Sequence, residues 1–298
     1  MDCRVKAFIR KLENLSISDY HGLSSPGLTC YLNSVLQVLF MTEDFREAVK
    51  SSKYSTNIDL HLRELFVGLE RTESETNHIT KKLGITDVYE QRDAAEYFEK
   101  ILCETSPEAS KIFKGDLNHK TTCLVCEKSS ESKSGFWILP LAVDDSRRKT
   151  VNVKQGLEGF FRVQNVCGDN QIYCESCKEK QDAAIECKMT QCPDVLTLLL
   201  KRFTFDYKQS RYVKLYNRVA VARHLHIANC RYNLYAVVHH WGDLTGGHYT
   251  ADIKSFETGD WYSFNDSVVK RVGQLFEPGD DCLRSCTAYL LMYRKVNE

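Results

Sequence analysis

The chain has 298 residues, of which 43% are apolar and 27% charged, a balance typical of a globular protein with a sizeable core. Its 40 Lys and Arg residues offset 40 Asp and Glu residues, which excludes a global charge that would draw it onto nucleic acid or an anionic membrane. No stretch reaches the roughly 18 apolar residues of a membrane-spanning helix, and the N-terminus lacks the apolar run of a signal peptide. Thirteen cysteines without such a signal favour reduced thiols, available for metal binding or catalysis.

Helical periodicity dominates the first hundred residues, whereas short β-branched and aromatic runs dominate the second half. Helices are predicted after Cys30 and within 57–72 and 92–102. Strands are predicted within 194–207, 232–242, 248–255, 260–269 and 287–295. The polar segments 51–57, 143–150 and 277–286 are predicted to be surface loops. The expected fold class is therefore α+β, with helices first and an antiparallel sheet after them.

A thiol stands where a loop rich in turn-forming residues meets the first helical pattern. Thr29 is the expected N-cap, which places Cys30 in the first turn of the helix. Unpaired backbone N–H groups and the positive end of the helix dipole favour a thiolate there and can hold a developing oxyanion. Cysteine is also a small hydrophobic residue common in cores, so Cys30 by itself leaves nucleophile and packing residue as alternatives.

His248 is the best candidate for the base that such a nucleophile needs. It follows a Gly-Gly pair, where Gly247 permits close backbone approach by a substrate, and it begins an alternating strand pattern. Asn265 and Asp266 end the next expected strand, and a hairpin would bring an amide or carboxylate beside the imidazole to accept the Nδ1 proton. Because the chain has nine histidines, a purely structural His248 is the alternative.

Two CxxC motifs supply four thiolates for one tetrahedral zinc ion: Cys123 with Cys126, and Cys174 with Cys177. Four thiolates close the coordination shell, so the expected zinc is structural and not catalytic. The segment 127–173 between the motifs is longer than in usual zinc ribbons, so part of it must belong to the main body. A redox pair is the alternative, although the βαβ pattern of thioredoxin-like sites is absent.

These motifs, in this order, resemble those of the ubiquitin-specific proteases. The stretch 22–40 resembles the family's cysteine box, 90–98 its Gln/Asp/Ala box, and 246–253 with 261–269 its histidine box. The CxxC pairs lie between the boxes, as in members with zinc-bearing fingers. The resemblance covers residues 20–295.

The resemblance implies a papain-like cysteine protease with a helical thumb, an antiparallel β palm and zinc-ribbon fingers. It implies an N-terminal extension over 1–19 and a catalytic domain over 20–296, with fingers carried by about 115–190. The implied activity is thiol-dependent hydrolysis of the isopeptide or peptide bond after the C-terminal Gly-Gly of ubiquitin or a ubiquitin-like modifier. The implied partners are the modifier and its conjugates, and neither nucleic acid nor a membrane is expected. The resemblance also implies a monomer with one structural zinc ion, located in the cytoplasm or the nucleus.

The resemblance also implies roles for single residues. Cys30 matches the nucleophile, His248 the base and Asn265 the third triad member, while Asp266 matches a neighbouring acid that shares or assumes that third role. The positions matched to the binding of the modifier's tail are Asp93 and Glu96, which face basic residues, and Phe203, His240, Gly247 and Tyr249, which surround the narrow channel for Gly-Gly. A helix cap or solvated face is the alternative for both acids, and sheet packing for Phe203.

One departure bears on rate. The family's oxyanion-donating Asn, five residues before the cysteine, is Ser25 here, and its shorter side chain predicts slow turnover. Ser25 thus favours an alternative of another class, a catalytically weak modifier-binding pseudoenzyme, which the intact Cys30, His248 and Asn265 oppose. A zinc-ribbon nucleic-acid module is a further alternative, disfavoured by a pI of about 7.1.

Overall fold

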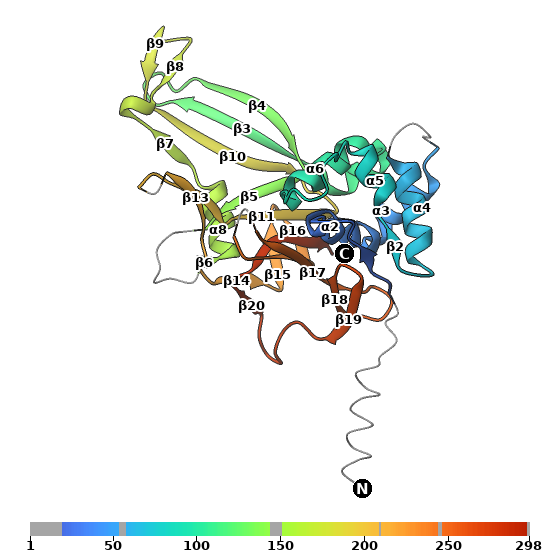
Figure 1. Cartoon of the computed structure of the whole chain (residues 1–298). Coiled ribbons are helices and arrows are strands. Elements are labelled where there is room, and N and C mark those ends of the chain that lie inside the picture. Colours follow the sequence, from blue (N-terminus) through green and yellow to red (C-terminus); the bar gives the residue numbers. More distant parts are fainter. Residues whose placement is uncertain (1–19, 54–57, 144–150, 209, 244–245, 297–298) are drawn as a thin grey trace. The chain divides into compact units, whose positions relative to one another are not determined.

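The structure is a computed structural model that describes residues 20–53, 58–143, 151–208, 210–243 and 246–296 (Figure 1). The chain divides into two compact units, of which the first contains residues 20–109 and 236–277 and the second contains 110–235 and 278–296. The extension expected over 1–19 lies outside the described residues, as do 54–57 and 144–150 of the predicted loops.

The first unit packs helices against antiparallel strands. Its elements are β1 (Leu23–Ser24), α2 (Cys30–Met41), α3 (Glu43–Ser51), α4 (Asp59–Leu69), β2 (Ser74–Glu75), α5 (Asn77–Lys82), α6 (Ala94–Glu104), the start of α7 (Pro107–Ser110), the end of β16 (Cys230–Trp241), β17 (His248–Lys254), β18 (Trp261–Asn265) and β19 (Val268–Gly273). The three predicted helices are confirmed as α2, α4 and α6.

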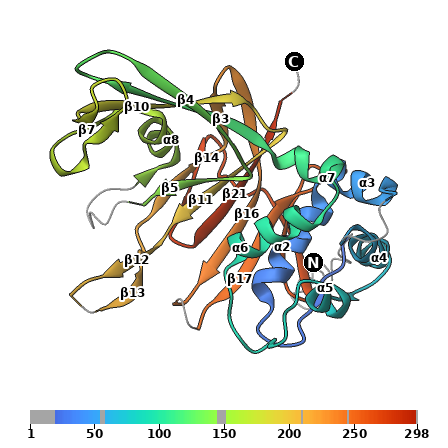
Figure 2. The same cartoon turned by 90° about the horizontal axis from the view of Figure 1, so that it is seen from above.

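Helix α2 forms the core of this unit. The sequence pattern predicts one apolar stripe, but all residues of α2 are buried. The reason is that α2 packs against α6 and also against β17 (Figure 2). Strands β16, β17, β18 and β19 pair in this order and antiparallel, as expected.

The second unit is mostly strands. Its elements are η1 (Lys111–Phe113), β3 (Gly115–Cys123), β4 (Ser129–Phe136), β5 (Ile138–Ala142), β6 (Val151–Asn152), α8 (Val153–Phe161), β7 (Gln164–Val166), η2 (Gly168–Asn170), β8 (Ile172–Cys174), β9 (Glu179–Gln181), β10 (Ala183–Gln191), β11 (Val195–Lys201), β12 (Phe203–Asp206), β13 (Arg211–Lys214), β14 (Val219–Ala222), β15 (His224–Ile227), the start of β16, β20 (Cys282–Ser285) and β21 (Ala288–Lys295).

Two strand predictions need correction in this unit. The expected sheet is purely antiparallel, but β5 pairs parallel with β11, while β21 pairs antiparallel on the other side of β11. The polar sequence of 277–286 predicts a loop, yet this segment contains β20, which pairs with β14. Backbone pairing with a buried strand stabilises β20 although its own sequence is polar.

Four strands of the second unit form a separate sheet in the order β4, β3, β10, β7, and Figure 1 shows the β8–β9 hairpin at the far end of this sheet. Both CxxC motifs lie here, because Cys123 ends β3 and Cys174 ends β8.

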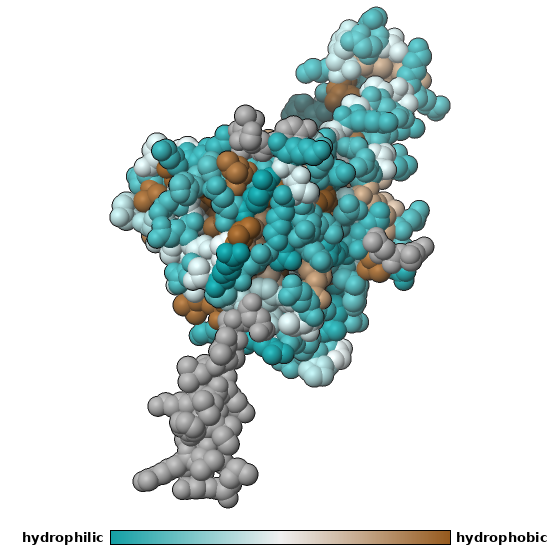
Figure 3. Space-filling model, turned by 90° about the vertical axis from the view of Figure 1, so that its right-hand side faces the viewer, coloured by the Kyte–Doolittle hydropathy of each residue, from teal (hydrophilic) through white to brown (hydrophobic). Residues whose placement is uncertain are grey.

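Apolar side chains lie mostly inside. On the face shown in Figure 3, hydrophilic residues predominate and apolar ones are scattered. Within the described residues, none of the helices combines the length and apolarity needed to cross a membrane.

Candidate active site and metal cluster

Cys30 is the first residue of α2 and is buried, with 4% of its surface exposed. Thr29 occupies the N-cap position as expected, and its carbonyl accepts the first helical hydrogen bonds, but its side chain makes no capping bond. The backbone N–H groups of the first turn thus lack a side-chain cap from Thr29. The helix start therefore offers donors for negative charge on the thiol or on a bound substrate.

His248 and Asn265 meet across the β17–β18 hairpin, as predicted. The His248 Nε2 atom lies 2.7 Å from Asn265 Oδ1. The prediction that Nδ1 makes this contact is wrong, because Nε2 is held by the amide, which leaves Nδ1 for the thiol.

The pKa of His248 is raised from 6.5 to about 9. The interaction with the Cys30 side chain is the largest cause, Asn265 and the charge of Asp266 also raise the pKa, and burial opposes them. His248 is therefore protonated at neutral pH and has a proton to give to a leaving group.

Asp266 holds the loop before Cys30. Its carboxylate accepts a hydrogen bond of 2.7 Å from Asn33 Nδ2, and its carbonyl accepts one of 2.9 Å from the Leu23 N–H. A Cβ atom on Gly22 would lie 2.5 Å from the same carbonyl oxygen, so only glycine fits there. The sequence predicts no role for Asn33, although a polar residue one turn beyond Cys30 in an apolar helix is a signal that could have found it.

Gln91, for which the sequence predicts no role, lies beside the thiol. Gln91 Nε2 lies 3.8 Å from Cys30 Sγ, and the backbone N–H of Tyr249 donates to the same sulfur at 3.4 Å. Gln91 is half-buried and precedes α6. Two N–H donors from different parts of the first unit thus converge on Cys30.

The Ser25 side chain, at the position of the family's oxyanion donor, bonds to its own loop. Its hydroxyl donates to the Gly27 carbonyl at 2.9 Å and contacts Thr29 Oγ1 at 2.9 Å. Both contacts lie within the loop before α2. The Ser25 side chain therefore stabilises that loop, and whether it slows turnover stays a prediction.

The two acids expected at the modifier's tail differ in environment. Asp93 is the N-cap of α6, and its Oδ1 accepts hydrogen bonds from the backbone N–H groups of Ala95 and Glu96. The Glu96 side chain is exposed in the first turn. Burial is the main cause of the raised pKa of Tyr249, and the charge of Asp93 is the second cause. Asp93 thus has a structural role whatever it binds.

His240 and Gly247 pack against each other. A Cβ atom on Gly247 would lie 2.1 Å from His240 Nε2, so the close approach at this glycine comes from His240. His240 is buried, and its ring lies 4.6 Å from that of Tyr249. These contacts hold Gly247 in place directly before β17, the strand that begins at His248. Phe203 belongs to the second unit, where its ring packs against Tyr289 at 5.9 Å.

The four CxxC cysteines converge in the second unit. Their Sγ atoms all lie within 4.8 Å of one another, with 4.0 Å from Cys123 to Cys177 and 3.6 Å from Cys126 to Cys174. A tetrahedron of sulfurs with metal bonds of about 2.3 Å has edges of about 3.8 Å. This cluster has the donors and the spacing to hold a metal ion.

The two CxxC turns share one backbone conformation. The residue after each motif has a positive φ, 58° at Glu127 and 61° at Lys178, and its N–H donates to the carbonyl of the first cysteine. The backbone N–H groups of Cys177 and Ser176 are the main causes that lower the pKa of Cys174 to about 6. The turn after Cys174 therefore favours the thiolate of that residue, the form that metal binding needs, whereas burial raises the pKa of Cys177 to about 12.

Comparisons with known proteins agree with this arrangement. The model of the family described as "Ubiquitin carboxyl-terminal hydrolase" matches residues 21–293. The chain is 28% identical to ubiquitin carboxyl-terminal hydrolase 47 of Xenopus tropicalis, with 95% of this chain and 28% of that protein covered. It is 27% identical to the Homo sapiens protein of that name (88% and 25% covered) and 30% identical to ubiquitin carboxyl-terminal hydrolase 48 of Danio rerio (84% and 27% covered). The chain spans about a quarter of the length of these relatives.

Proposed function

Because the chain belongs to the ubiquitin carboxyl-terminal hydrolase family, we propose that it is a cysteine-type deubiquitinase acting on ubiquitin conjugates. Membership of the family confirms the resemblance of the motifs. The observation that carries the proposal is the 2.7 Å contact between His248 and Asn265 beside the buried thiol of Cys30. Nucleophile, base and orienting amide together are the minimum that acyl transfer by a cysteine requires.

The proposed reaction has two steps. The Cys30 thiolate attacks the carbonyl carbon of the modifier's C-terminal glycine, the bond from this carbon to the lysine nitrogen breaks, and imidazolium His248 gives its Nδ1 proton to the departing amine. The products of this step are the free amine and a thioester on Cys30. Neutral His248 then takes a proton from water, which attacks the thioester and releases the modifier as a carboxylate. Asn265 holds Nε2 throughout and so keeps Nδ1 directed at the sulfur.

Gln91 is proposed as the side-chain donor to the oxyanion that forms at Cys30. Its amide carries two hydrogens, lies 3.8 Å from Sγ and comes from a different loop than Ser25. The oxyanion bound to the attacked carbon lies close to Sγ, within reach of that amide and of the N–H groups at the start of α2. Gln91 thus replaces the donor missing at position 25, and no observation favours the pseudoenzyme.

The four-cysteine cluster is proposed to hold one structural zinc ion. All four ligands come from the chain, which leaves no coordination position for substrate. The ion would tie the β3–β4 turn to the β8–β9 hairpin, and it takes no part in the reaction.

The finer architecture is proposed from the family. The first unit contains the helices of a thumb, and the second contains fingers and strands of a palm. Asp93, Glu96, Phe203, His240, Gly247 and Tyr249 are proposed to recognise the modifier's tail. A monomer in the cytoplasm or the nucleus, without nucleic-acid or membrane partners, stays our expectation.

The experiment is hydrolysis of fluorogenic substrates made from ubiquitin and from several ubiquitin-like modifiers. We expect turnover of at least one substrate by the native chain and none by Cys30→Ala. An exposed cysteine supplies the control, because Cys103→Ala should keep full turnover. Lack of turnover of every substrate by a folded chain would refute the proposal.

A further inference from the structure

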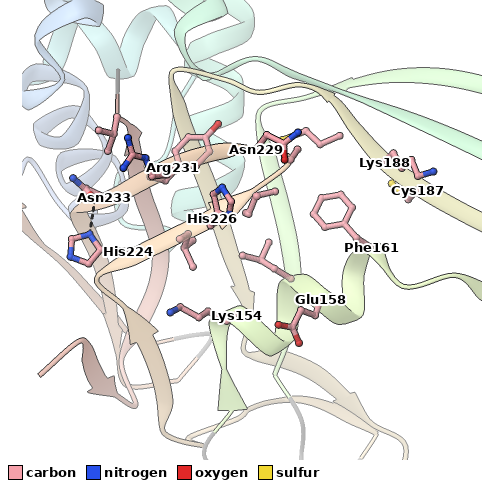
Figure 4. A pocket seen from close by; sticks show the side chains of 17 residues that line it. Lys154, Glu158, Phe161, Cys187, Lys188, His224, His226, Asn229, Arg231 and Asn233 are labelled. Atoms are coloured by element: carbon pink, nitrogen blue, oxygen red, sulfur yellow. Dashed lines mark hydrogen bonds between the residues drawn. The ribbon is translucent and has the colours of Figure 1, made fainter. Parts of the chain in front are cut away.

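A groove of about 1160 Å³ lies within the second unit, and none of the described residues that line it takes part in the proposed reaction. Its walls are β15 with the turn that follows it, α8, and part of β10 (Figure 4). Figure 4 shows His226 on β15 across from Lys154 and Phe161 of α8, His224 joined to Asn233 on the neighbouring strand, and Lys188 on β10. Three elements far apart in the sequence therefore enclose one surface.

Strand β15 has an open edge along this groove. Among the described strands it pairs only with β16, and every residue from His224 to Asn229 lines the groove. The turn residues Ala228 and Asn229 have φ values of 47° and 65°, as in a two-residue type I′ hairpin. In such a hairpin the pair next to the turn, Ile227 and Cys230, exchanges hydrogen bonds, and the next pair does not. His226 and His224 therefore direct their backbone N–H and C=O groups away from β16.

The charged side chains around the groove are mainly basic. Among the described residues that line the groove, Lys154, Lys188 and Arg231 are exposed cations and Glu158 is the carboxylate. Lys188 contacts Glu186 at 2.8 Å on its own strand, but 68% of its side chain stays accessible. The groove also contains apolar side chains, of which Leu157 and Leu225 are buried and Phe161 is half-buried. The surface thus combines strand-pairing groups, positive charge and apolar contacts.

We propose that this groove binds an extended acidic peptide of a partner protein. The peptide adds as a strand to the open edge of β15, and its backbone pairs with the N–H and C=O groups of His224 and His226. Its carboxylates face Lys154, Lys188 and Arg231, and its alternate apolar residues contact Phe161 and Leu225. Backbone pairing supplies affinity, and the basic rim selects acidic sequences.

The probe is a fluorescein-labelled peptide of eight residues that alternates Glu and Val, titrated with the 298-residue chain while anisotropy is recorded. We expect saturable binding that weakens with salt. We expect at least tenfold weaker binding when alternate backbone nitrogens of the peptide are methylated, because these cannot donate to β15. No saturation up to about 1 mM protein overturns the proposal.

Variants separate the contribution of the basic side chains from that of backbone pairing with β15. Reversing two charges with Lys154→Glu and Arg231→Glu should weaken binding about tenfold or more, whereas Lys133→Glu, an exposed lysine on β4, should leave it unchanged. His226→Pro removes an outward N–H that β16 does not use, and proline is tolerated at such edge positions. We expect His226→Pro to weaken binding at least fivefold relative to His226→Ala, which keeps the N–H.

Other outcomes would point to a different kind of site. Equal affinity for the methylated peptide, or equal binding by His226→Pro and His226→Ala, means anion binding without strand addition and overturns the proposal. Equal binding by the charge-reversed protein also overturns it. The assay involves no catalysis, so its result is independent of the proposed hydrolysis.

Discussion

Replacing Gln91 tests the origin of oxyanion stabilisation. Gln91→Ala removes an amide whose nitrogen lies 3.8 Å from Cys30 Sγ, while the Tyr249 N–H at 3.4 Å and the donors of α2 stay in place. Losing one oxyanion donor costs on the order of 100 to 1,000-fold in kcat, or about 2.7–4 kcal/mol of transition-state stabilisation. We expect kcat to fall by this factor with KM little changed, because the hydrogen bond from Gln91 to the oxyanion forms only in the transition state.

Ser25→Asn supplies the second half of a double-mutant cycle. Alone it should change kcat by less than about threefold, because Gln91 already donates to the oxyanion, whereas the short side chain of Ser25 considered by itself predicts a rise. In the Gln91→Ala background it should restore at least about tenfold of the lost kcat, since an asparagine amide at position 25 can replace the missing donor.

The assay is steady-state hydrolysis of ubiquitin-fluorophore by the four proteins of this cycle. Gln91→Met, which keeps the length of the side chain without its N–H groups, should behave as Gln91→Ala. Gln155→Ala, an exposed glutamine on α8, should behave as the native chain. Unchanged kcat in Gln91→Ala, a loss confined to KM, or strictly additive effects of Gln91→Ala and Ser25→Asn would refute the assignment of Gln91.

Three further outcomes are expected. The rate of hydrolysis should fall at alkaline pH with an apparent pKa of about 9, because His248 then loses the proton that it gives to the leaving amine. Asn265→Ala should move this alkaline limb to lower pH, because Asn265 raises the pKa of His248. An alkaline limb at the same pH in Asn265→Ala would contradict this. Elemental analysis should find one zinc per chain, and Cys174→Ser should lose it and lower the melting temperature by roughly 5 °C or more; a native protein free of metal would contradict the site. Gly247→Ala should reduce kcat about tenfold or more, since its Cβ would meet the His240 ring, whereas Gly246→Ala, with open space around its Cβ, should stay within about twofold; equal rates would refute this.

Local sequence patterns predict much of this structure. The apolar periodicity of α2 and the turn-rich loop before it determine where Cys30 lies, and alternation fixes the β17–β18 pairing that brings His248 to Asn265. The CxxC spacing likewise brings each pair of sulfurs to one side of a turn.

Other features depend on contacts that no local pattern encodes. Nothing in the stretch 90–93 says which side chain faces the thiol, so the role of Gln91 emerges only when its loop is placed beside α2. Strand β4 is polar and exposed along most of its length, so it lacks the apolar alternation that marks half-buried strands. The groove beside β15 arises from segments distant in sequence and has no motif of its own.

The central claim is that Cys30 is the nucleophile of a deubiquitinase. Its most direct test is incubation of the chain with ubiquitin bearing a C-terminal electrophile, followed by mass spectrometry of the adduct's peptides. We predict one ubiquitin per chain, attached to Cys30, and no adduct with Cys30→Ala. Attachment to another of the thirteen cysteines, or an adduct that persists in Cys30→Ala, would contradict the account.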